Sequence, residues 1–131
     1  MERKNYLTGA IFVFLCLMIG FAFHFVGRGE EVKDLRHLWK AAHVHGMGFA
    51  FLNIFYGLLI QNIKLKGKII ATGSVLAVVG CVVFPTSLFF AGFNREIAKL
   101  ALGGTIPMAI AWVIMTYAIV SSKLSKRESR S

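Results

Sequence analysis

Charged residues and cysteines are scarce in this chain of 131 residues. Only 16% of the residues are charged, 56% are hydrophobic, and there are only two cysteines. A disordered tail or a nucleic-acid-binding module needs a far more polar composition, and a disulfide scaffold needs many cysteines. The composition therefore excludes these three classes and indicates one apolar domain that covers residues 1–131.

Asp, Glu, Lys and Arg are missing altogether from four stretches: Leu7 to Val26, His43 to Ile63, Ile69 to Ala91 and Leu100 to Ser121. Each has about the 20 residues that an α-helix needs to cross a bilayer. Helices of a soluble bundle would carry a polar stripe, and none of these stretches has one. The first stretch is longer than the apolar region of a usual signal peptide, and no small-x-small cleavage site follows it, which favours a transmembrane helix. We therefore predict an all-α integral membrane protein, a bundle of four transmembrane helices at about residues 7–26, 41–63, 68–91 and 98–122.

The basic residues predict how these helices are oriented. The links are short, so neighbouring helices should be antiparallel, and the formal charge is +9. The N-terminus, the link around residues 61–68 and the C-terminal tail then share one side. That side carries nine of the 15 Lys and Arg residues: Arg3, Lys4, Lys64, Lys66, Lys68, Lys123, Lys126, Arg127 and Arg130. The positive-inside rule makes this side cytoplasmic, as in a bacterial inner membrane, so the charge indicates topology and contact with membrane lipid and no nucleic-acid partner.

Small residues on the third predicted helix favour close packing. They recur at helical spacing: Gly73, Ala77, Gly80 and Cys81. Such a face lets a neighbouring helix approach closely. Pro85, in the same helix, removes a backbone donor, and kinks of this kind often border cavities. Cys16 and Cys81 lie in apolar surroundings and are predicted to be buried free thiols.

All four histidines fall near the side of the bundle opposite the termini: His24, His37, His43 and His45. Neutral imidazole is the commonest protein ligand for transition metals and for haem iron. His24 and His37 can equally be explained as interfacial side chains. The other two lie inside the start of an apolar helix, where a polar group usually has a function. We therefore expect at least one of His43 and His45 to be a ligand.

Helix geometry separates these two histidines. Residues two apart point about 200° apart on an α-helix, so they cannot both bind one metal ion unless the backbone there is irregular. His43 is predicted to face an apolar wall beside Ala50, a surface that suits a flat macrocycle. His45 is predicted to face a line of polar groups that reaches Asn53.

Further residues near the second helix are candidates for a site. An unpaired amide near mid-bilayer is costly, so Asn53 needs a partner helix, a water or a bound ligand. Trp39 is typical of an interfacial anchor. Four basic residues near the histidines have the chemistry to pair with haem propionates: Arg28, Lys33, Arg36 and Lys40.

Three short segments carry a resemblance. They are Gly20-Phe-Ala-Phe-His24-Phe-Val-Gly27-Arg-Gly-Glu30, then Trp39-Lys-Ala-Ala-His43, and Val79-Gly80-Cys-Val-Val-Phe84. These segments resemble parts of the first loop, the entry to the second helix and the third helix of the styrene oxide isomerases. That family consists of small membrane enzymes with four transmembrane helices.

The resemblance implies a homotrimer that binds haem b between protomers. The axial ligand of the haem iron would be His43, with His45 as the second choice. The other cofactor-binding candidates are His24, Trp39, Arg36 and Lys40. In that family ferric haem acts as a Lewis acid on an epoxide, a small apolar substrate, and a hydride shift gives a carbonyl compound. A dry pocket of low dielectric favours this chemistry, because water would trap the cation.

Two positions differ from the family pattern. The family's asparagine six residues after the ligand histidine corresponds to Phe49, and its tyrosine on the third helix corresponds to Val82. Asn53 and Tyr56 are therefore the candidates for the catalytic roles, and haem binding carries over better than isomerisation.

Two other classes of function remain open. One is a b-type cytochrome for electron transfer, in which His24 and either His43 or His45 would ligate the iron from two sides. The other is an accessory membrane protein without a cofactor. A proton-coupled transporter is disfavoured, because the four apolar stretches hold no carboxylate or lysine.

Overall fold

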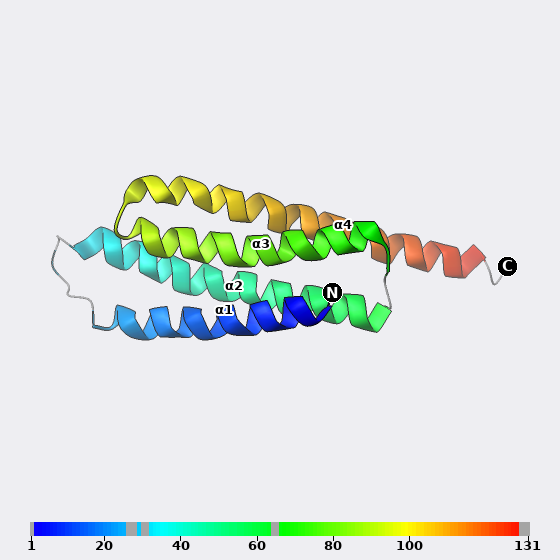
Figure 1. Cartoon of the computed structure of the whole chain (residues 1–131), viewed down its shortest axis with the longest axis horizontal. Coiled ribbons are helices and arrows are strands. Elements are labelled where there is room, and N and C mark those ends of the chain that lie inside the picture. The colour runs from blue at the N-terminus through cyan, green and yellow to red at the C-terminus, as the bar shows by residue number, and fades with distance from the viewer. Residues whose placement is uncertain (1, 26–28, 30–31, 64–65, 129–131) are drawn as a thin grey trace.

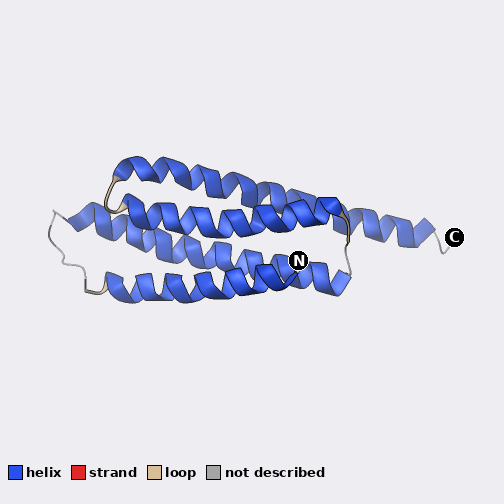
Figure 2. Cartoon of the chain, viewed as in Figure 1, coloured by secondary structure: helices blue, strands red, loops and turns tan. Residues whose placement is uncertain are grey.

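The computed structural model describes residues 2–25, 29, 32–63 and 66–128. The described chain forms four long helices and one short 3-10 helix: α1 (Glu2–Phe23), α2 (Lys33–Ile63), α3 (Lys68–Ala91), η2 (Arg95–Leu100) and α4 (Ala101–Glu128). Each long helix is long and apolar enough to cross a membrane. The predicted all-α fold with four membrane-spanning helices is confirmed, and Figure 2 shows helices and no strand among the described residues.

Successive helices run in opposite directions (Figure 1). The end of α1, the start of α2, η2 and the start of α4 lie at one end of the bundle, which we call the loop end. The N-terminus, the link between α2 and α3, and the C-terminus lie at the other end, which we call the terminal end. The prediction that both termini and this link share one side is therefore confirmed, and α4 continues beyond the other helices at the terminal end.

The helix bounds differ from the predicted ones where the chain is charged. α1 occupies Glu2–Phe23 instead of 7–26, and α2 begins at Lys33 instead of about residue 41. Hydrophobicity marks the part of a helix that crosses the bilayer, whereas charged residues continue the same helix outside it. Asp34 in the first turn of α2 favours that start, because its charge complements the helix dipole. Asp34 also forms an ion pair with Arg95 of η2, and η2 delays the start of α4 to Ala101.

The two middle helices hold the bundle together. α1 packs mainly on α2 and α4 packs mainly on α3, while no contact joins α1 to α4 within the described chain. The main buried cluster lies where α2, α3 and α4 meet and includes Ala50, Tyr56, Ala77, Met108 and Met115. α1 is therefore held mainly by α2, and it can lie farther from α3 along part of its length.

The small face of α3 packs closely, as predicted. A methyl group on Gly80 would lie 2.7 Å from Cβ of Met108 and 2.8 Å from the carbonyl oxygen of Gly104. Ala77 and Cys81 are completely buried, and both cysteines are free thiols. The absence of side chains at Gly80 and Gly104 therefore brings the backbones of α3 and α4 into contact.

Candidate functional site

The histidines lie toward the loop end, as predicted. His24 directly follows α1, and the other three lie in the first half of α2. His43 is half-buried, whereas His24, His37 and His45 are exposed. Across the described residues, no three His, Cys, Asp or Glu side chains come together as a metal-binding group.

The imidazole of His43 lies in the seam between α1 and α2. Its Nδ1 is 2.7 Å from the carbonyl oxygen of Cys16. Because a carbonyl oxygen only accepts, Nδ1 is the donor, and the lone pair of the neutral ring is left on Nε2. The ring also packs on Gly20, where a methyl group would lie 2.6 Å from both Nδ1 and Cε1. Metal-binding histidines are typically held in this way, with one ring nitrogen fixed by an outer partner.

His45 lies on a different side of α2, as the helix geometry predicts. Its ring meets Phe84 of α3 edge-on, with the ring centroids 6.2 Å apart. Phe84 also stacks on Phe49, with the centroids 4.3 Å apart. The predicted line of polar groups beside His45 is wrong, because these aromatic rings occupy the place where polar groups were expected.

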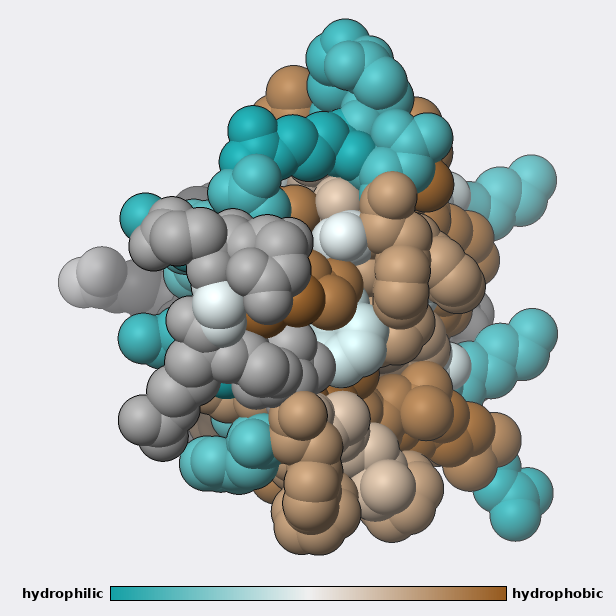
Figure 3. Space-filling model, turned by 90° about the vertical axis from the view of Figure 1, so that its left-hand side faces the viewer, coloured by the Kyte–Doolittle hydropathy of each residue, from teal (hydrophilic) through white to brown (hydrophobic). Residues whose placement is uncertain are grey.

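Arg36, Lys40 and His43 follow one edge of α2. Their spacing of four and three residues places them on one side of the helix, over a rise of about 10 Å. The Arg36 guanidinium lies over the ring of Phe23 in α1, 4.4 Å from its centroid, and Lys40 is exposed. Figure 3 looks at the loop end and shows hydrophilic side chains around its edge, beside apolar ones. Some residues named in the sequence analysis lie outside the described residues. They are Gly27, Arg28 and Glu30 of the first segment that carries the resemblance, and the basic residues Lys64 and Arg130.

Trp39 packs on α3 instead of standing free at the membrane interface. Its Nε1 donates a hydrogen bond to the carbonyl oxygen of Phe89 at 3.1 Å. Its ring stacks on Phe89 with the centroids 4.9 Å apart, and Phe93 meets it edge-on. Trp39 thus lies one helical turn before His43 on α2, while its ring is held against α3.

Asn53 belongs to a buried polar cluster with Asn5 and Ser74. Nδ2 of Asn5 donates to Oδ1 of Asn53 at 2.7 Å, and Nδ2 of Asn53 donates to the Asn5 carbonyl oxygen at 3.1 Å. The Ser74 hydroxyl donates to Oδ1 of Asn5. All three residues are buried and connect α1, α2 and α3. Partner helices thus satisfy the Asn53 amide, about 15 Å along α2 from His43.

Tyr56 is completely buried where α2, α3 and α4 meet. Its hydroxyl lies against Gly73 and has no hydrogen-bond partner among the described residues. Its ring meets Trp112 edge-on, with the centroids 6.0 Å apart. Tyr56 is one turn farther from His43 than Asn53, so the structure does not bring either catalytic candidate to the histidine.

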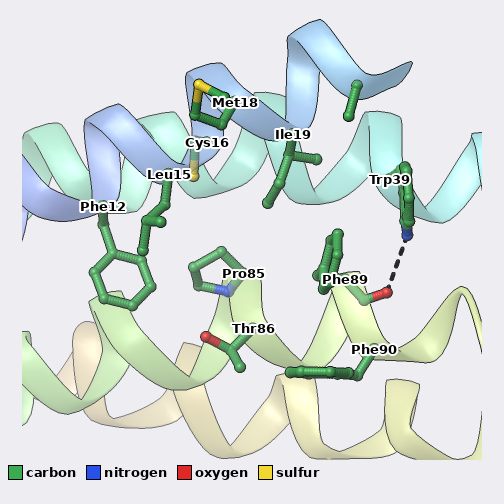
Figure 4. Close-up of a pocket in the computed structure, with 11 residues that line it drawn as sticks. Phe12, Leu15, Cys16, Met18, Ile19, Trp39, Pro85, Thr86, Phe89 and Phe90 are labelled. Atoms are coloured by element: carbon green, nitrogen blue, oxygen red, sulfur yellow. Dashed lines mark hydrogen bonds between the residues drawn. The ribbon is translucent and has the colours of Figure 1, made fainter. Parts of the chain in front are cut away.

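A cavity of about 510 Å³ opens between α1 and α3, with Trp39 at its end. Figure 4 shows it with its lining residues, which are Phe12, Leu15, Cys16, Met18, Ile19, Ala22, Trp39, Pro85, Thr86, Phe89 and Phe90. Gly46 of α2 lets Cys16 of α1 and Pro85 of α3 lie close to the α2 backbone. A methyl group at Gly46 would lie 2.6 Å from Sγ of Cys16 and 2.7 Å from Cβ of Pro85. The expectation that Pro85 borders a cavity is confirmed.

The interior face of α1 was missed by the sequence analysis. Asn5, Gly9, Cys16 and Gly20 all contact α2 through side chains, backbone or close approach. The signal was present, because these small or polar residues recur on one side of an otherwise large and apolar helix. Reading that side would have predicted the α1–α2 seam in which His43 lies.

The chain matches no protein-family model, no curated protein and no solved structure. Its function is therefore inferred from the arrangement of its own residues and from the resemblance of its motifs.

Proposed function

We propose that this chain is an integral membrane protein that binds haem b, similar to the styrene oxide isomerases. The observation that carries the proposal is the hydrogen bond from Nδ1 of His43 to the Cys16 carbonyl. It leaves Nε2 as the ligating atom and fixes the ring between two helices. His45 has no such anchor among the described residues, since its ring only meets Phe84, and it is the second choice.

The neighbouring charges support haem as the ligand. Arg36 and Lys40 lie on the edge of α2 that carries His43, closer to the loop end. Haem propionates are anions that pair well with such cations. Arg36 and Lys40 would hold the propionates of a haem whose iron His43 binds.

One chain supplies only part of a haem pocket. His43 is half-buried, and its neighbours Val44 and Phe51 are about half exposed, at 53% and 52%. We therefore include in the proposal that a second copy completes the pocket in a homotrimer, as the resemblance implies. The termini would be cytoplasmic and the membrane a bacterial inner membrane, because the terminal end carries most of the basic residues.

Ferric haem bound there would supply a Lewis acid for the isomerisation of an epoxide to a carbonyl compound. The chain itself would orient the cofactor through His43 and exclude water through the apolar side chains around it. The catalytic roles of Asn53 and Tyr56 stay predictions, and their distance from His43 favours positioning roles. Unaltered isomerase activity in Asn53→Ala and Tyr56→Phe would remove both from the mechanism.

The test is an absorption spectrum of detergent-purified protein from cells supplied with a haem precursor. We expect a stoichiometric Soret band that is lost in His43→Ala and retained in His45→Ala. The second variant is a matched control, because it removes the same side chain two residues away on another side of α2. Loss of the band in His45→Ala alone would show that the ligand is assigned wrongly, and a colourless wild-type protein would overturn the haem proposal.

The spin state then separates the possible activities. A high-spin ferric spectrum indicates an accessible sixth position and leads to epoxide assays. A low-spin spectrum that responds to reductant indicates a b-type cytochrome, with His24 as the candidate second ligand. Colourless, folded protein would favour an accessory membrane protein without a cofactor.

A further inference from the structure

A second, open cavity lies on the outer surface of α1 near the terminal end. It has a volume of about 560 Å³, and its described lining residues are Arg3, Lys4, Tyr6, Leu7 and Ala10. Tyr6 is half-buried and the other four are exposed. The cavity therefore joins two cations to an apolar surface, and it shares no residue with the proposed haem site.

The depth of this cavity in the membrane follows from the sequence of α1. Leu7 is the first residue of the charge-free stretch and marks where the hydrocarbon core begins. Arg3 lies four residues earlier, which is about 6 Å farther out at the rise of an α-helix. The headgroup layer of a bilayer is about 5–7 Å deep on each side. The cations of the cavity therefore lie at the level of the lipid phosphates.

The two cations of the cavity are not neutralised within the described chain. Arg3 and Lys4 form no ion pair with a described residue. At the loop end, by contrast, Arg95 pairs with Asp34. Glu2 is the only carboxylate of α1, and it is not among the described residues that line the cavity. An anion in the cavity would therefore meet two positive charges of α1 and no carboxylate of that helix.

Tyr6 forms a fixed wall of the cavity. Its hydroxyl donates a hydrogen bond to Oε1 of Gln61 in α2 at 2.7 Å. Its ring also lies against Gly57 of α2, where a methyl group would be 3.1 Å from Cε1 of the ring. The side chain is held between two helices, so this wall is in place before a ligand binds. Such preorganisation lowers the entropic cost of binding.

The apolar part of the cavity continues along α1 toward the middle of the membrane. Leu7 and Phe14 are both 63% exposed. Ala10 lies between them on the same side of the helix, at a spacing of three and four residues. Its small side chain leaves space between two large ones, and an acyl chain can pack there through dispersion contacts. The cavity thus suits a molecule with an anionic head and an apolar tail.

We propose that this cavity binds one anionic glycerophospholipid of the leaflet at the terminal end. Arg3 and Lys4 hold the phosphodiester, and an acyl chain lies over Leu7 and Ala10. The excess of basic residues at this end accounts for the orientation of the chain. It does not account for a cavity that connects two of these residues to an apolar surface, and a bound lipid does.

The test is native mass spectrometry of the full chain in detergent, titrated with phosphatidylglycerol or with phosphatidylcholine of the same acyl chains. Choline cancels the charge of the phosphate, so the two lipids differ in net charge. We expect wild-type protein to bind one phosphatidylglycerol about ten-fold more tightly than phosphatidylcholine, the value of a charge-assisted hydrogen bond. Arg3→Gln combined with Lys4→Gln should reduce the affinity for phosphatidylglycerol to that for phosphatidylcholine.

Matched variants separate the cavity from the overall charge. Lys66→Gln combined with Lys68→Gln removes two exposed cations from the same end, outside the described lining of the cavity, and should leave the affinity for phosphatidylglycerol unchanged. Ala10→Phe keeps both cations and fills the apolar part, so it should weaken binding several-fold, with helicity checked by circular dichroism. His43→Ala should bind the lipid as wild type does, which separates this proposal from the haem proposal.

Three results would overturn the proposal. Equal binding of the two lipids by wild-type protein would show that the cations do not select an anionic headgroup. An equal loss of affinity in the two double variants, or none in Ala10→Phe, would show that the overall charge attracts the lipid without the cavity. Binding of glycerol 3-phosphate as tight as that of phosphatidylglycerol would show that a soluble phosphate, and no lipid, is the ligand.

Discussion

At the scale of single residues, the same helix carries polar groups with different tasks. His43 donates Nδ1 to a backbone carbonyl and keeps Nε2 free of that bond. Asn53 uses both its amide nitrogen and its oxygen within a cluster of buried partners. Both residues looked like site candidates in the sequence, because a polar group within an apolar helix needs a partner. The partners differ: a backbone carbonyl bonds one ring nitrogen of His43, whereas another asparagine bonds both the oxygen and the nitrogen of the Asn53 amide.

Gly20→Ala tests the orientation of His43. The new methyl group would lie 2.6 Å from the imidazole, so the ring must leave its place on α1 and weaken its bond to Cys16. We expect a folded protein with a several-fold lower haem content, measured as the ratio of Soret to protein absorbance. Disturbing the hydrogen bond that orients a ligating histidine typically costs about 10–100-fold in affinity at metal sites.

Gly48→Ala is the matched control, since no atom lies within 4 Å of the added methyl group. Equal haem content in the two alanine variants would contradict the role of Gly20 in holding His43.

At the scale of helices, close approach depends on which glycines face another backbone. Gly80 of α3 lies against Gly104 of α4, and Gly104 in turn lies against Phe84 of α3. Because lipid is as apolar as the helix surfaces, this contact is stabilised by packing and not by the hydrophobic effect. α1 contacts α3 less than it contacts α2, and the cavity lies between α1 and α3.

Gly80→Ala should push α3 and α4 apart. Its methyl group would lie 2.7 Å from Cβ of Met108, and overpacking of this kind costs about 1–3 kcal/mol. We expect a corresponding loss of stability in unfolding by sodium dodecyl sulfate, followed by circular dichroism.

Gly103→Ala is the control on α4, because its nearest new contact is Cγ1 of Val83 at 3.9 Å. That variant should be as stable as wild type or gain up to about 1 kcal/mol from the better helix propensity of alanine. A destabilisation as large as that of Gly80→Ala would show that the close contact between Gly80 and Gly104 does not explain the loss of stability in Gly80→Ala.

At the scale of the whole molecule, the four antiparallel helices place the charged segments at two ends. The terminal end contains the N-terminus, the link with Lys66 and Gly67, and the C-terminus (Figure 1). Gly67 has a φ of 118°, a left-handed backbone conformation that glycine adopts without strain, and α3 begins directly after it. The loop end contains the histidines and the Arg36 and Lys40 edge.

Cysteine labelling tests the orientation of these two ends. With a membrane-impermeant maleimide on intact spheroplasts, Lys99→Cys at the loop end should react, whereas Lys66→Cys should react only after permeabilisation. The reason is the excess of basic residues at the terminal end. Wild type should not react in either case, because Cys16 and Cys81 are buried. Labelling of Lys66→Cys in intact spheroplasts would invert the proposed topology.

The sequence by itself determined the number of helices, their alternating direction and the end at which the histidines gather. These features follow from the length of the apolar stretches and from the places where charge is excluded, both of which are local properties. It also determined that His43 and His45 point in different directions, because residues two apart on an α-helix point about 200° apart. The tertiary structure alone decided which groups meet across helices. The Cys16 carbonyl under His43, the Asn5 and Ser74 partners of Asn53, and the cavity beside Thr86 all depend on the rotation and separation of α1 relative to α2 and α3. In a chain whose helix faces are nearly all apolar, hydrophobicity does not choose between these rotations, and close packing and buried hydrogen bonds do.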